Sequence, residues 1–468
     1  MVQNQKKQPK QTYNWRKQTM AANTWNVKIK EMLAFGDDET INTVYYHINV
    51  DLLNSDHAWR IFTDEDMGKV PVLDYPSTHT LLKELQKIPS CIILIMRVAL
   101  VHDYINDFGG AERVLLALSE IYPKAPIYTL YAKKNSAAYK RFKNRHIIES
   151  WFANLPFPDK LISPFRFLIP MLWSKFDFSK FDFVITSSSW AITKGIKKGK
   201  NTTEICYLHT PPRYLYGFDS SRRYKNKYFQ KLLKAYSLIV NHFMRLYDFE
   251  HAQKVDYFIV NSKNVQLRCQ KYYRRDSTII YPPVDTNVSK DNSKLNLLID
   301  LPKKYYLAGG RLVAAKNFDL IIKTMNKLYL PLLIYGSGSE EKHLRKIAGP
   351  TITFLGNIND HDLHYLYKNA ICFVVAQRDE DFGITPIEAN AEGTPVIAFH
   401  DGGYLETVIE GKTGIFFDEL TSKSLAKAIK KLEKNKFNPT TLQNHAQKFS
   451  KKRFQQQIQK FIKSKLQI

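Results

Sequence analysis

Long apolar runs are missing from the chain. The longest run near its start is CIILIMRVALV at 91–101, and Arg97 interrupts it. A helix that crosses a bilayer needs about 20 mostly apolar residues. A secretory signal ends in a small-residue cleavage site, and none follows this run. We therefore expect neither a membrane-spanning helix nor a signal peptide.

Cysteine is scarce and scattered. The four cysteines, Cys91, Cys206, Cys269 and Cys372, lie far apart in the sequence. Zinc sites and disulfide frameworks need cysteines at characteristic spacings, so we expect neither. Unpaired, scattered cysteines are typical of a reducing compartment, and we expect the protein to be cytoplasmic.

Two nucleotide-binding motifs are absent as well. The chain contains neither the dinucleotide fingerprint G-x-G-x-x-G nor the P-loop motif G-x-x-x-x-G-K-[ST]. The missing fingerprint argues against an oxidoreductase that uses a dinucleotide, and the missing P-loop motif argues against a P-loop nucleotide-binding protein.

Acidic residues are outnumbered, with 44 Asp and Glu against 69 Lys and Arg, and the net charge is +25. Residues 1–30 hold seven basic side chains and no acidic one, whereas 31–95 hold four basic and eleven acidic ones. These two regions cancel, so the excess belongs to 96–468. A basic surface suits nucleic acid, anionic lipid or phosphorylated small molecules, and charge does not choose among them.

The chain does contain a regular alternation of short apolar segments and helical patterns. Such alternation predicts parallel sheets with helices on both faces. The apolar segments form two series, 98–101, 125–131, 181–189, 203–211 and 256–262, then 304–312, 331–338, 352–356, 371–376, 394–399 and 414–417.

These series predict an α/β protein of two Rossmann-like domains that face each other across a cleft, with an additional N-terminal region. Paired prolines and a polar linker at 279–296 separate the series, which places the domains at 96–290 and 291–440. We expect 441–468 to form a C-terminal helix that packs back on the first domain. The extension 1–95 carries no recognisable chemical motif, and its Gln/Lys-rich beginning has the composition of a disordered segment.

The stretch EDFGITPIEANAEGTPVIA at 380–398 carries two carboxylates, Glu380 and Glu388, eight positions apart. Pro386 near the start of the predicted helix fits, because a helix start leaves its first N–H groups unpaired anyway. The free amides there suit anionic or hydroxyl-rich ligands, and carboxylates accept hydrogen bonds from sugar hydroxyls. The alternative is a solvated helix face, but the surrounding turn residues favour a ligand site.

Two cations follow a second glycine turn. In GGRLVAAKN at 309–317, a predicted strand ends in two glycines, and Arg311 and Lys316 follow before a helix. A guanidinium and an ammonium group at that spacing can hold a diphosphate from two sides. The alternative is that both are ordinary surface cations of a basic chain.

The first domain offers weaker signals. FGGAE at 108–112 places Gly109 and Gly110 in a turn at a predicted helix start, where backbone can approach a phosphate. His209 in CYLHTPPRYLY follows a predicted strand and should face the cleft opposite Glu380. A single histidine is more often structural, so its position at a strand end carries the functional interpretation.

The segment 222–254 alternates cations with aromatics on what we expect to be a helix pair. One interpretation is a contact with a lipid surface, with Lys and Arg at anionic headgroups and aromatics at the interface. The other is a pair of amphipathic helices whose aromatics face the core. The pattern does not decide between them.

Taken together, these motifs resemble the retaining glycosyltransferases of the GT-B fold, family 4, and among them the mannosyltransferase-like members of O-antigen and exopolysaccharide assembly. The resemblance covers about 97–468 and leaves out 1–95. It is carried, in the family's order, by VALVHDYINDFGGAERVL, CYLHTPPRYLY, VDYFIVNS, YPPVDT, GGRLVAAKN, FLG and the two-glutamate stretch. One departure is LVAAKN after Arg311, where small residues replace bulkier ones.

The resemblance implies a nucleotide sugar as substrate, with no cofactor and no metal ion. Its implied catalytic residues are Glu380 on the sugar hydroxyls, Arg311 and Lys316 on the diphosphate, and His209 near the anomeric centre. Its implied donor-binding residues are Glu388 on the ribose, the backbone of Phe382, Gly383 and Ile384 around the sugar, Thr385 at the helix start, and Gly109 and Gly110 over the phosphates. The Asp-x-Asp pair in RDED at 378–381 lies inside the sugar-binding loop rather than at a metal-binding strand end.

The implied reaction moves a hexose, with mannose from GDP-mannose as the first candidate, to a lipid-linked or glycan acceptor in surface polysaccharide synthesis. The resemblance and the basic segment 222–254 together suggest a peripheral position at the inner face of the membrane. The alternative is a basic nucleic-acid-binding protein without transferase activity, but no RRM, OB or helix-turn-helix pattern supports it. A phosphorylase of the same fold would need a pyridoxal lysine and a longer chain.

Overall fold

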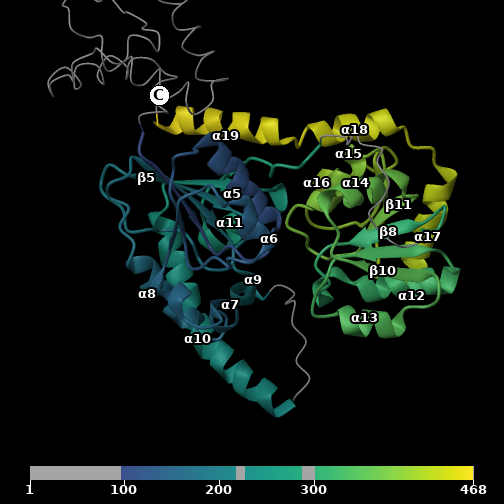
Figure 1. The fold of residues 1–468 in the computed structure, drawn as a ribbon, viewed down its shortest axis with the longest axis horizontal. Coiled ribbons are helices and arrows are strands. Elements are labelled where there is room, and N and C mark those ends of the chain that lie inside the picture. The colour runs from purple at the N-terminus through teal and green to yellow at the C-terminus, as the bar shows by residue number, and fades with distance from the viewer. Residues whose placement is uncertain (1–95, 218–226, 287–300, 467–468) are drawn as a thin grey trace, which may run out of the picture. The chain divides into compact units, whose positions relative to one another are not determined.

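The computed structural model describes residues 96–217, 227–286 and 301–466. Arg97–Leu466 form one compact unit, and the expectation for 1–95 lies outside the described residues. The unit contains two parallel sheets, each covered by helices on both faces (Figure 1). The predicted α/β architecture of two Rossmann-like halves is confirmed.

The first sheet has seven parallel strands in the order β3-β2-β1-β4-β5-β6-β7. The strands are β1 (Val98–His102), β2 (Ile127–Thr129), β3 (Ile147–Glu149), β4 (Phe183–Ser188), β5 (Thr203–Leu208), β6 (Tyr257–Val260) and β7 (Thr278–Ile279). The helices between them are α5 (Gly110–Ile121), α6 (Ala137–Arg141), η3 (Trp151–Asn154), α7 (Pro158–Leu161), η4 (Arg166–Leu168), α8 (Ile169–Ser174), α9 (Arg213–Tyr216), α10 (Lys227–Lys254) and α11 (Lys263–Tyr273).

Alternate residues of these strands bury against different helices. One face packs on α8, α9 and α10, as Val101 and Val184 share a core with Trp173 and Met244. The other face carries α5, and α19 (Lys451–Leu466) reaches it, since Tyr207 contacts Phe454. Because both faces are covered, the strands read as continuous apolar runs.

The second sheet has six parallel strands in the order β10-β9-β8-β11-β12-β13. They are β8 (Tyr306–Gly309), β9 (Leu332–Tyr335), β10 (Ile352–Gly356), β11 (Cys372–Val375), β12 (Val396–Phe399) and β13 (Gly414–Phe417). The core on one face includes residues of α12 (Phe318–Leu328), α13 (Glu341–Ile347) and α17 (Ser422–Lys434). The core on the other includes residues of α14 (Asp360–Asn369), α15 (Ile384–Ala391) and α16 (Tyr404–Thr407). A short η5 (Ala314–Lys316) precedes α12.

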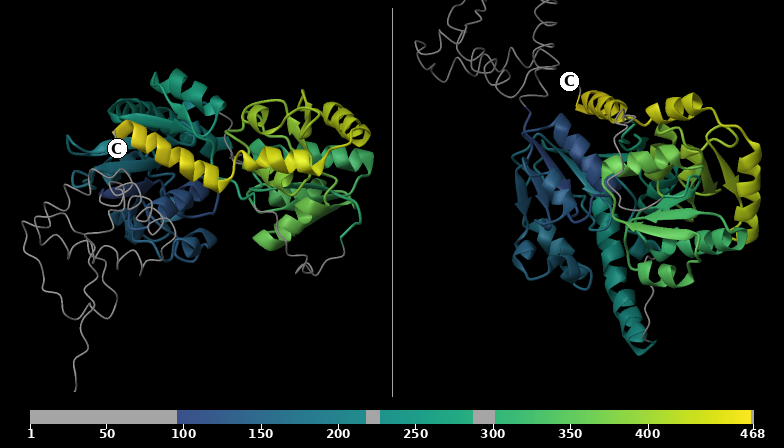
Figure 2. Two further views of the ribbon diagram at one scale, coloured as in Figure 1. Left: turned by 90° about the horizontal axis from the view of Figure 1, so that it is seen from above. Right: turned by 45° about the vertical axis from the view of Figure 1, so that its right-hand side comes forward.

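The C-terminal part crosses between the halves. The expected single helix at 441–468 is two helices, α18 (Pro439–Gln447) and α19. α18 packs on α15 of the second half and α19 on α5 of the first (Figures 1 and 2). The chain breaks between them because Phe449 accepts a hydrogen bond from Val284 N at 2.9 Å, which ties the break to the linker between the sheets.

Two further differences from the sequence predictions have simple causes. β3 and β7 were missed because they are short edge strands of three and two residues. The helix pair expected at 222–254 is wrong: in the described part of that segment, α10 is a single helix of 28 residues. It contains no glycine or proline that would interrupt it.

Candidate functional site

Each sheet reverses its strand order at one position, between β1 and β4 and between β8 and β11. Ligands of open parallel sheets bind beyond the carboxyl ends of the strands at such a reversal. In the second sheet, the loop after β8 carries Arg311 and Lys316, and the loop after β11 carries Glu380. The structure therefore brings these three predicted residues to one edge of one sheet.

The two cations face different groups. Lys316, the last residue of η5, acts electrostatically on Glu380, and its Nζ lies beside Gly310. Arg311 is exposed and acts electrostatically on Tyr104 of the first half. One cation therefore lies at the acidic loop and the other toward the opposite half.

Glu380 is held beside Tyr404 of α16, whose hydroxyl donates to Glu380 Oε2 at 3.4 Å. Burial raises the pKa of Glu380, and the charge of Lys316 opposes that rise. Gly402 and Gly403 pack directly on the backbone of the 379–382 loop, so a side chain at either position would collide with it. This close backbone packing holds the Glu380 loop in one place.

α15 begins at Ile384, after Gly383 with φ of 90°. A left-handed backbone at this position favours glycine. Phe382 buries its ring against Tyr281 and Phe449 at the junction of the halves, which leaves the backbone of the turn to face a ligand. Gly110 lies against Ile384, so the two glycine-containing turns meet at this helix start.

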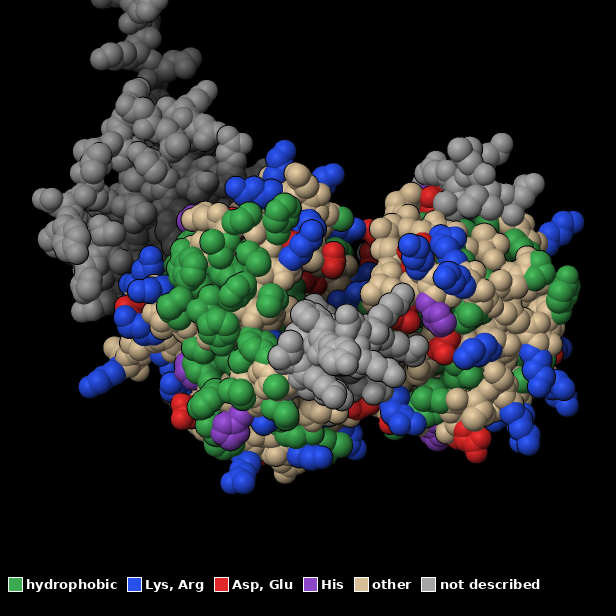
Figure 3. All heavy atoms as spheres, turned by 90° about the horizontal axis from the view of Figure 1, so that it is seen from below, with side chains coloured by type: hydrophobic (Ala, Val, Ile, Leu, Met, Phe, Trp, Pro, Cys, Tyr) green, Lys and Arg blue, Asp and Glu red, His purple; other side chains and the backbone are tan. Residues whose placement is uncertain are grey.

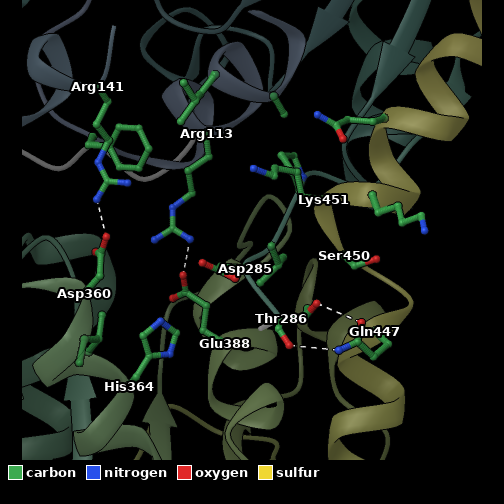
Figure 4. Close-up of a pocket in the computed structure, with 18 of the residues that line it drawn as sticks. Arg113, Arg141, Asp285, Thr286, Asp360, His364, Glu388, Gln447, Ser450 and Lys451 are labelled. Atoms are coloured by element: carbon green, nitrogen blue, oxygen red, sulfur yellow. Dashed lines mark hydrogen bonds and ion pairs between the residues drawn. The ribbon is translucent and has the colours of Figure 1, made fainter. Parts of the chain in front are cut away.

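Glu388 lies one turn into α15 and pairs with Arg113 of α5, in the opposite half (Figure 4). Its other oxygen accepts a hydrogen bond from Tyr367 at 3.4 Å, and Tyr367 in turn contacts Tyr335 at 2.6 Å. Close pairing with the carboxylate raises the pKa of Arg113 despite burial, which opposes the rise. Glu388 is thus a fixed acceptor that faces the first half.

A cavity of about 430 Å3 opens beside this pair. It lies between α5, α14 and the two segments that connect the halves, as Figure 4 shows. Arg141 pairs there with Asp360, and the ring of Phe108 lies under the guanidinium of Arg141 at 4.2 Å. The cavity therefore extends the ligand-accessible space from Glu388 toward α14.

His209 follows β5 and is almost buried. Its Nε2 lies 2.8 Å from Ser187 Oγ. Burial, and to a lesser extent the nearby His102, lower the pKa of His209 to about 4. The negative charge of Asp381, in the second half, acts on this pKa in the opposite direction.

The two aspartates of RDED, Asp379 and Asp381, form ion pairs that join the second half to the first. Asp381 accepts from Arg213 of α9 at 2.8 Å and pairs with Arg268 of α11, and Asp379 pairs with Arg268 at 2.5 Å. Burial favours the neutral form of Asp381, but the two guanidinium groups outweigh it and lower the pKa. In the parts of the chain that the structure describes, no three acidic, histidine or cysteine side chains gather as a metal ion would require.

Sequence analysis missed the arginines of the first half that meet the second. Arg113 directly follows the glycine turn GGAE and Arg213 follows the Pro-Pro turn, so both stood next to motifs already singled out. Their partners lie 275 and 168 positions away. No local pattern reports such pairings, because they depend on how the halves meet.

Two known families match the chain. Residues 108–288 match the family described as Glycosyltransferase Family 4, and residues 289–455 match Glycosyl transferases group 1. The boundary between the matches falls in the linker between the two sheets.

Curated relatives are distant. The chain is 24% identical over 398 positions to the alpha-1,3/1,6-mannosyltransferase ALG2 of Dictyostelium discoideum, with 73% of this chain and 91% of the relative covered. It is 32% identical over 140 positions to the mannosylfructose-phosphate synthase of Agrobacterium fabrum, with 26% and 31% covered. The latter match thus spans about a third of that relative's length.

Solved structures share the fold. HepE of Anabaena in complex with UDP and glucose superposes with a TM-score of 0.56 at 16% identity, covering 79% of this chain and all of that one. The sucrose-phosphate synthase of Thermosynechococcus elongatus gives a TM-score of 0.57 at 16% identity, with 79% and 99% covered.

Two Rossmann-like sheets, with a carboxylate and cationic groups at the switch point of the second, have the architecture of the GT-B fold. Both halves match families of glycosyltransferases, which supports a glycosyltransferase with this fold.

Proposed function

We propose that the protein transfers a hexose from a nucleotide sugar to a lipid-linked or glycan acceptor, with retention of anomeric configuration. The observation that carries the proposal is the meeting of Arg311, Lys316 and Glu380 at the switch point of the second sheet, with Glu388 on the helix that follows. Cations for a diphosphate and carboxylates for hydroxyl groups are what a nucleotide sugar needs.

In this proposal Glu388 binds the ribose and Glu380 the hydroxyls of the hexose. The backbone at Phe382, Gly383 and Ile384 surrounds the hexose. The remaining groups act on the reacting bond: Thr385 at the start of α15, the turn at Gly109 and Gly110, the cations Arg311 and Lys316, and His209 beside the transferred sugar.

The reaction breaks the bond between the anomeric carbon and the diphosphate oxygen. The acceptor hydroxyl bonds to the same face of that carbon, and its proton passes to the leaving phosphate oxygen. Negative charge grows on the diphosphate during this step, so fixed cations stabilise the transition state more than the bound donor. We propose that Arg311 and Lys316 do so without a metal ion, which predicts full activity in the presence of a chelator.

Mannose is the proposed hexose. Two of the curated relatives carry mannosyl in their names, ALG2 and the mannosylfructose-phosphate synthase. GDP-mannose is therefore the first donor to test, in a role in surface polysaccharide synthesis, and UDP-glucose is the second, because HepE was solved with UDP and glucose.

The acceptor side of the proposal is a lipid surface. α10 buries Val240, Met244 and Tyr247 in or against the core of the first half. A second stripe of the same helix is exposed, and it consists of Leu238, Ile239, Phe243, Leu246 and Phe249. Apolar side chains gather on the face of the first half shown in Figure 3.

A neighbouring segment adds to this stripe. The residues around η4 contact α10, since Arg166 donates to Asn241 at 2.9 Å. Phe165 and Phe167 beside it are exposed, as are Phe157 and Met171. None of the described helices is long and apolar enough to cross a membrane. We propose that this surface rests on the headgroup region of an anionic membrane, at its inner face, where a lipid-linked acceptor is found.

The reaction is tested by nucleotide release from a panel of nucleotide sugars, with a lipid-linked acceptor extract supplied. Wild type should release one nucleotide from one donor, and Glu388→Ala should abolish the release. Glu410→Ala is the matched control, because Glu410 is exposed and pairs with Lys431 away from the site. Release that survives Glu388→Ala would contradict the site, and NMR of the product's anomeric configuration tests retention.

The lipid surface is tested by sedimentation with vesicles of phosphatidylglycerol and phosphatidylcholine. Ile239→Ser with Phe243→Ser should reduce the bound fraction several-fold, because both side chains are more than 60% exposed and would lose apolar burial. Leu405→Ser, an exposed leucine on α16, should leave binding unchanged. Equal binding by all three proteins would refute this surface.

A further inference from the structure

A row of buried polar side chains crosses the carboxyl ends of the first sheet. His102 is the last residue of β1 and pairs in register with Ser187 of β4, and His209 follows β5. Their exposed fractions are 2%, 1% and 8%. The row lies at the strand reversal of the first sheet, facing the donor site, and the roles proposed above use His209 alone.

Ser187 links the two histidines of the row by hydrogen bonds. Ser187 Oγ lies 3.0 Å from Nδ1 of His102 and 2.8 Å from Nε2 of His209. On the far side, Nε2 of His102 lies 3.7 Å from Oε1 of Glu112. The other oxygen of Glu112 accepts a hydrogen bond from Gly109 N at 2.8 Å. The row therefore begins at the glycine turn and ends at the proposed sugar site.

The number of protons on these groups determines which atom donates and which accepts in each contact of the row. An ionised carboxylate cannot donate, so the nitrogen of His102 that faces Glu112 carries the proton. At 3.7 Å this contact is too long for a hydrogen bond, but the buried negative charge still favours an N–H toward it. His102 Nδ1 then accepts from the Ser187 hydroxyl. The hydroxyl of Ser187 donates its only proton to His102, so its oxygen accepts a hydrogen bond from Nε2–H of His209.

We propose that Glu112, His102 and Ser187 are positioning residues that hold His209 in its Nε2–H tautomer, so that Nδ1 offers a lone pair to a hydroxyl group of the transferred hexose. No described residue forms a hydrogen bond to Nδ1 of His209. The part that concerns the hexose rests on the proposed function, whereas the tautomer does not. The same carboxylate also fixes the glycine turn, so one residue orients groups on both parts of the donor.

Glu112→Gln is the variant that should exchange the donor and acceptor roles along the row. Glutamine keeps the oxygen that accepts from Gly109 N, and it is accepted at this position of a capping box. Glutamine also replaces the carboxylate charge that faces Nε2 of His102 with the N–H groups of an amide, which favours an unprotonated Nε2 and moves the proton of His102 to Nδ1. Ser187 then donates to His209 Nε2, and the proton of His209 moves to Nδ1. Ser187→Ala instead removes the link, and Ser187→Thr restores it.

The tautomer is measured by NMR of the full chain labelled with 15N-histidine, in which the two ring nitrogens have distinct shifts when protonated and unprotonated. The His209 signal is assigned by its loss in His209→Gln. We expect Nε2–H in wild type and Ser187→Thr, and Nδ1–H in Glu112→Gln. Nδ1–H in wild type, or an unchanged tautomer in Glu112→Gln, would overturn the proposal. Thermal unfolding of each variant checks that the fold is kept.

The hexose is tested with donors in which one hydroxyl at a time is replaced by fluorine, which accepts hydrogen bonds but cannot donate them. Wild type should transfer one of these about tenfold less efficiently than the parent, the effect of roughly one hydrogen bond. Glu112→Gln should remove most of that preference. The same preference in both proteins would refute the role in sugar recognition. Absence of transfer from every donor would overturn the proposed function and leave the tautomer result standing.

Discussion

At the scale of single residues, the proposed donor site is a set of charges whose partners differ. Glu380 is held by a tyrosine and faces Lys316, whereas Glu388 is bound by an arginine of the opposite half. Arg311 is exposed. Arg311 and Lys316 are the cations assigned to the proposed diphosphate. Their removal should therefore affect the reaction more than the fold.

Arg311→Ala and Lys316→Ala should each lower the transfer rate by roughly a hundred- to a thousand-fold, the usual effect of removing one donor that stabilises transition-state charge. Thermal unfolding should change little, because Arg311 is exposed and Lys316 is half-buried. The measurement is the initial rate of nucleotide release at saturating donor. Lys342→Ala, on the exposed face of α13, is the control. Near-wild-type rates in both site variants would contradict the proposal that Arg311 and Lys316 hold the diphosphate.

His209 gives a second prediction, for stability. Burial lowers its pKa to about 4 from an ordinary value of about 6.5. Between these values the unfolded chain binds a proton that the folded chain does not, so the free energy of unfolding falls as the pH is lowered from 7 to 4. His209→Gln should reduce the fall in melting temperature between pH 7 and pH 5. An unchanged pH dependence would show that His209 is not buried in its neutral form.

At the scale of elements, the sequence predicted most strands because they are buried on both faces and read as apolar runs. The helix after Glu380 was also predictable, because Pro386 and Gly383 mark its start, and α15 begins at Ile384. β3 escaped detection, since its three residues are half-buried at an edge. The break between α18 and α19 depends on pairing with Val284, far away in sequence, so no local signal announces it.

Gly383 is the element-scale test, because it sets the direction in which α15 starts. Gly383→Ala should destabilise the fold by roughly 1–3 kcal/mol and weaken donor binding, since φ is 90° and the new methyl group would lie 2.9 Å from the ring of Tyr404. Gly411→Ala is the control, with φ of 71° but open space around it. Equal losses in the two variants, measured by chemical unfolding and by donor titration, would show that backbone strain alone is responsible.

At the scale of the whole described unit, its two halves meet through charged pairs at the site itself. Arg113 binds Glu388, and Arg213 and Arg268 bind the RDED loop. Glu388 and the RDED loop could be named from the sequence, but their arginine partners could not, because the pairing follows from how the halves pack. Arg113 occupies the carboxylate that the proposal assigns to the ribose, so donor and Arg113 compete for it.

Arg113→Gln should therefore tighten the binding of nucleoside diphosphates about tenfold, the lower end of the effect of one charged hydrogen bond. Calorimetric titration measures the change. Arg141→Gln is the comparison, because its partner is Asp360 rather than Glu388. Weaker binding in Arg113→Gln would mean that Arg113 assists the donor instead of competing with it.

The central claim is that Glu388 and its neighbours form a nucleotide-sugar site. Its most direct test is calorimetric titration of GDP and UDP into wild type, Glu388→Gln and Glu410→Gln. We predict that wild type and Glu410→Gln bind one nucleotide with the same affinity, and that Glu388→Gln binds it at least tenfold more weakly, because a carboxylate acceptor is lost. Binding of neither nucleotide, or equal affinity in all three proteins, would contradict the account.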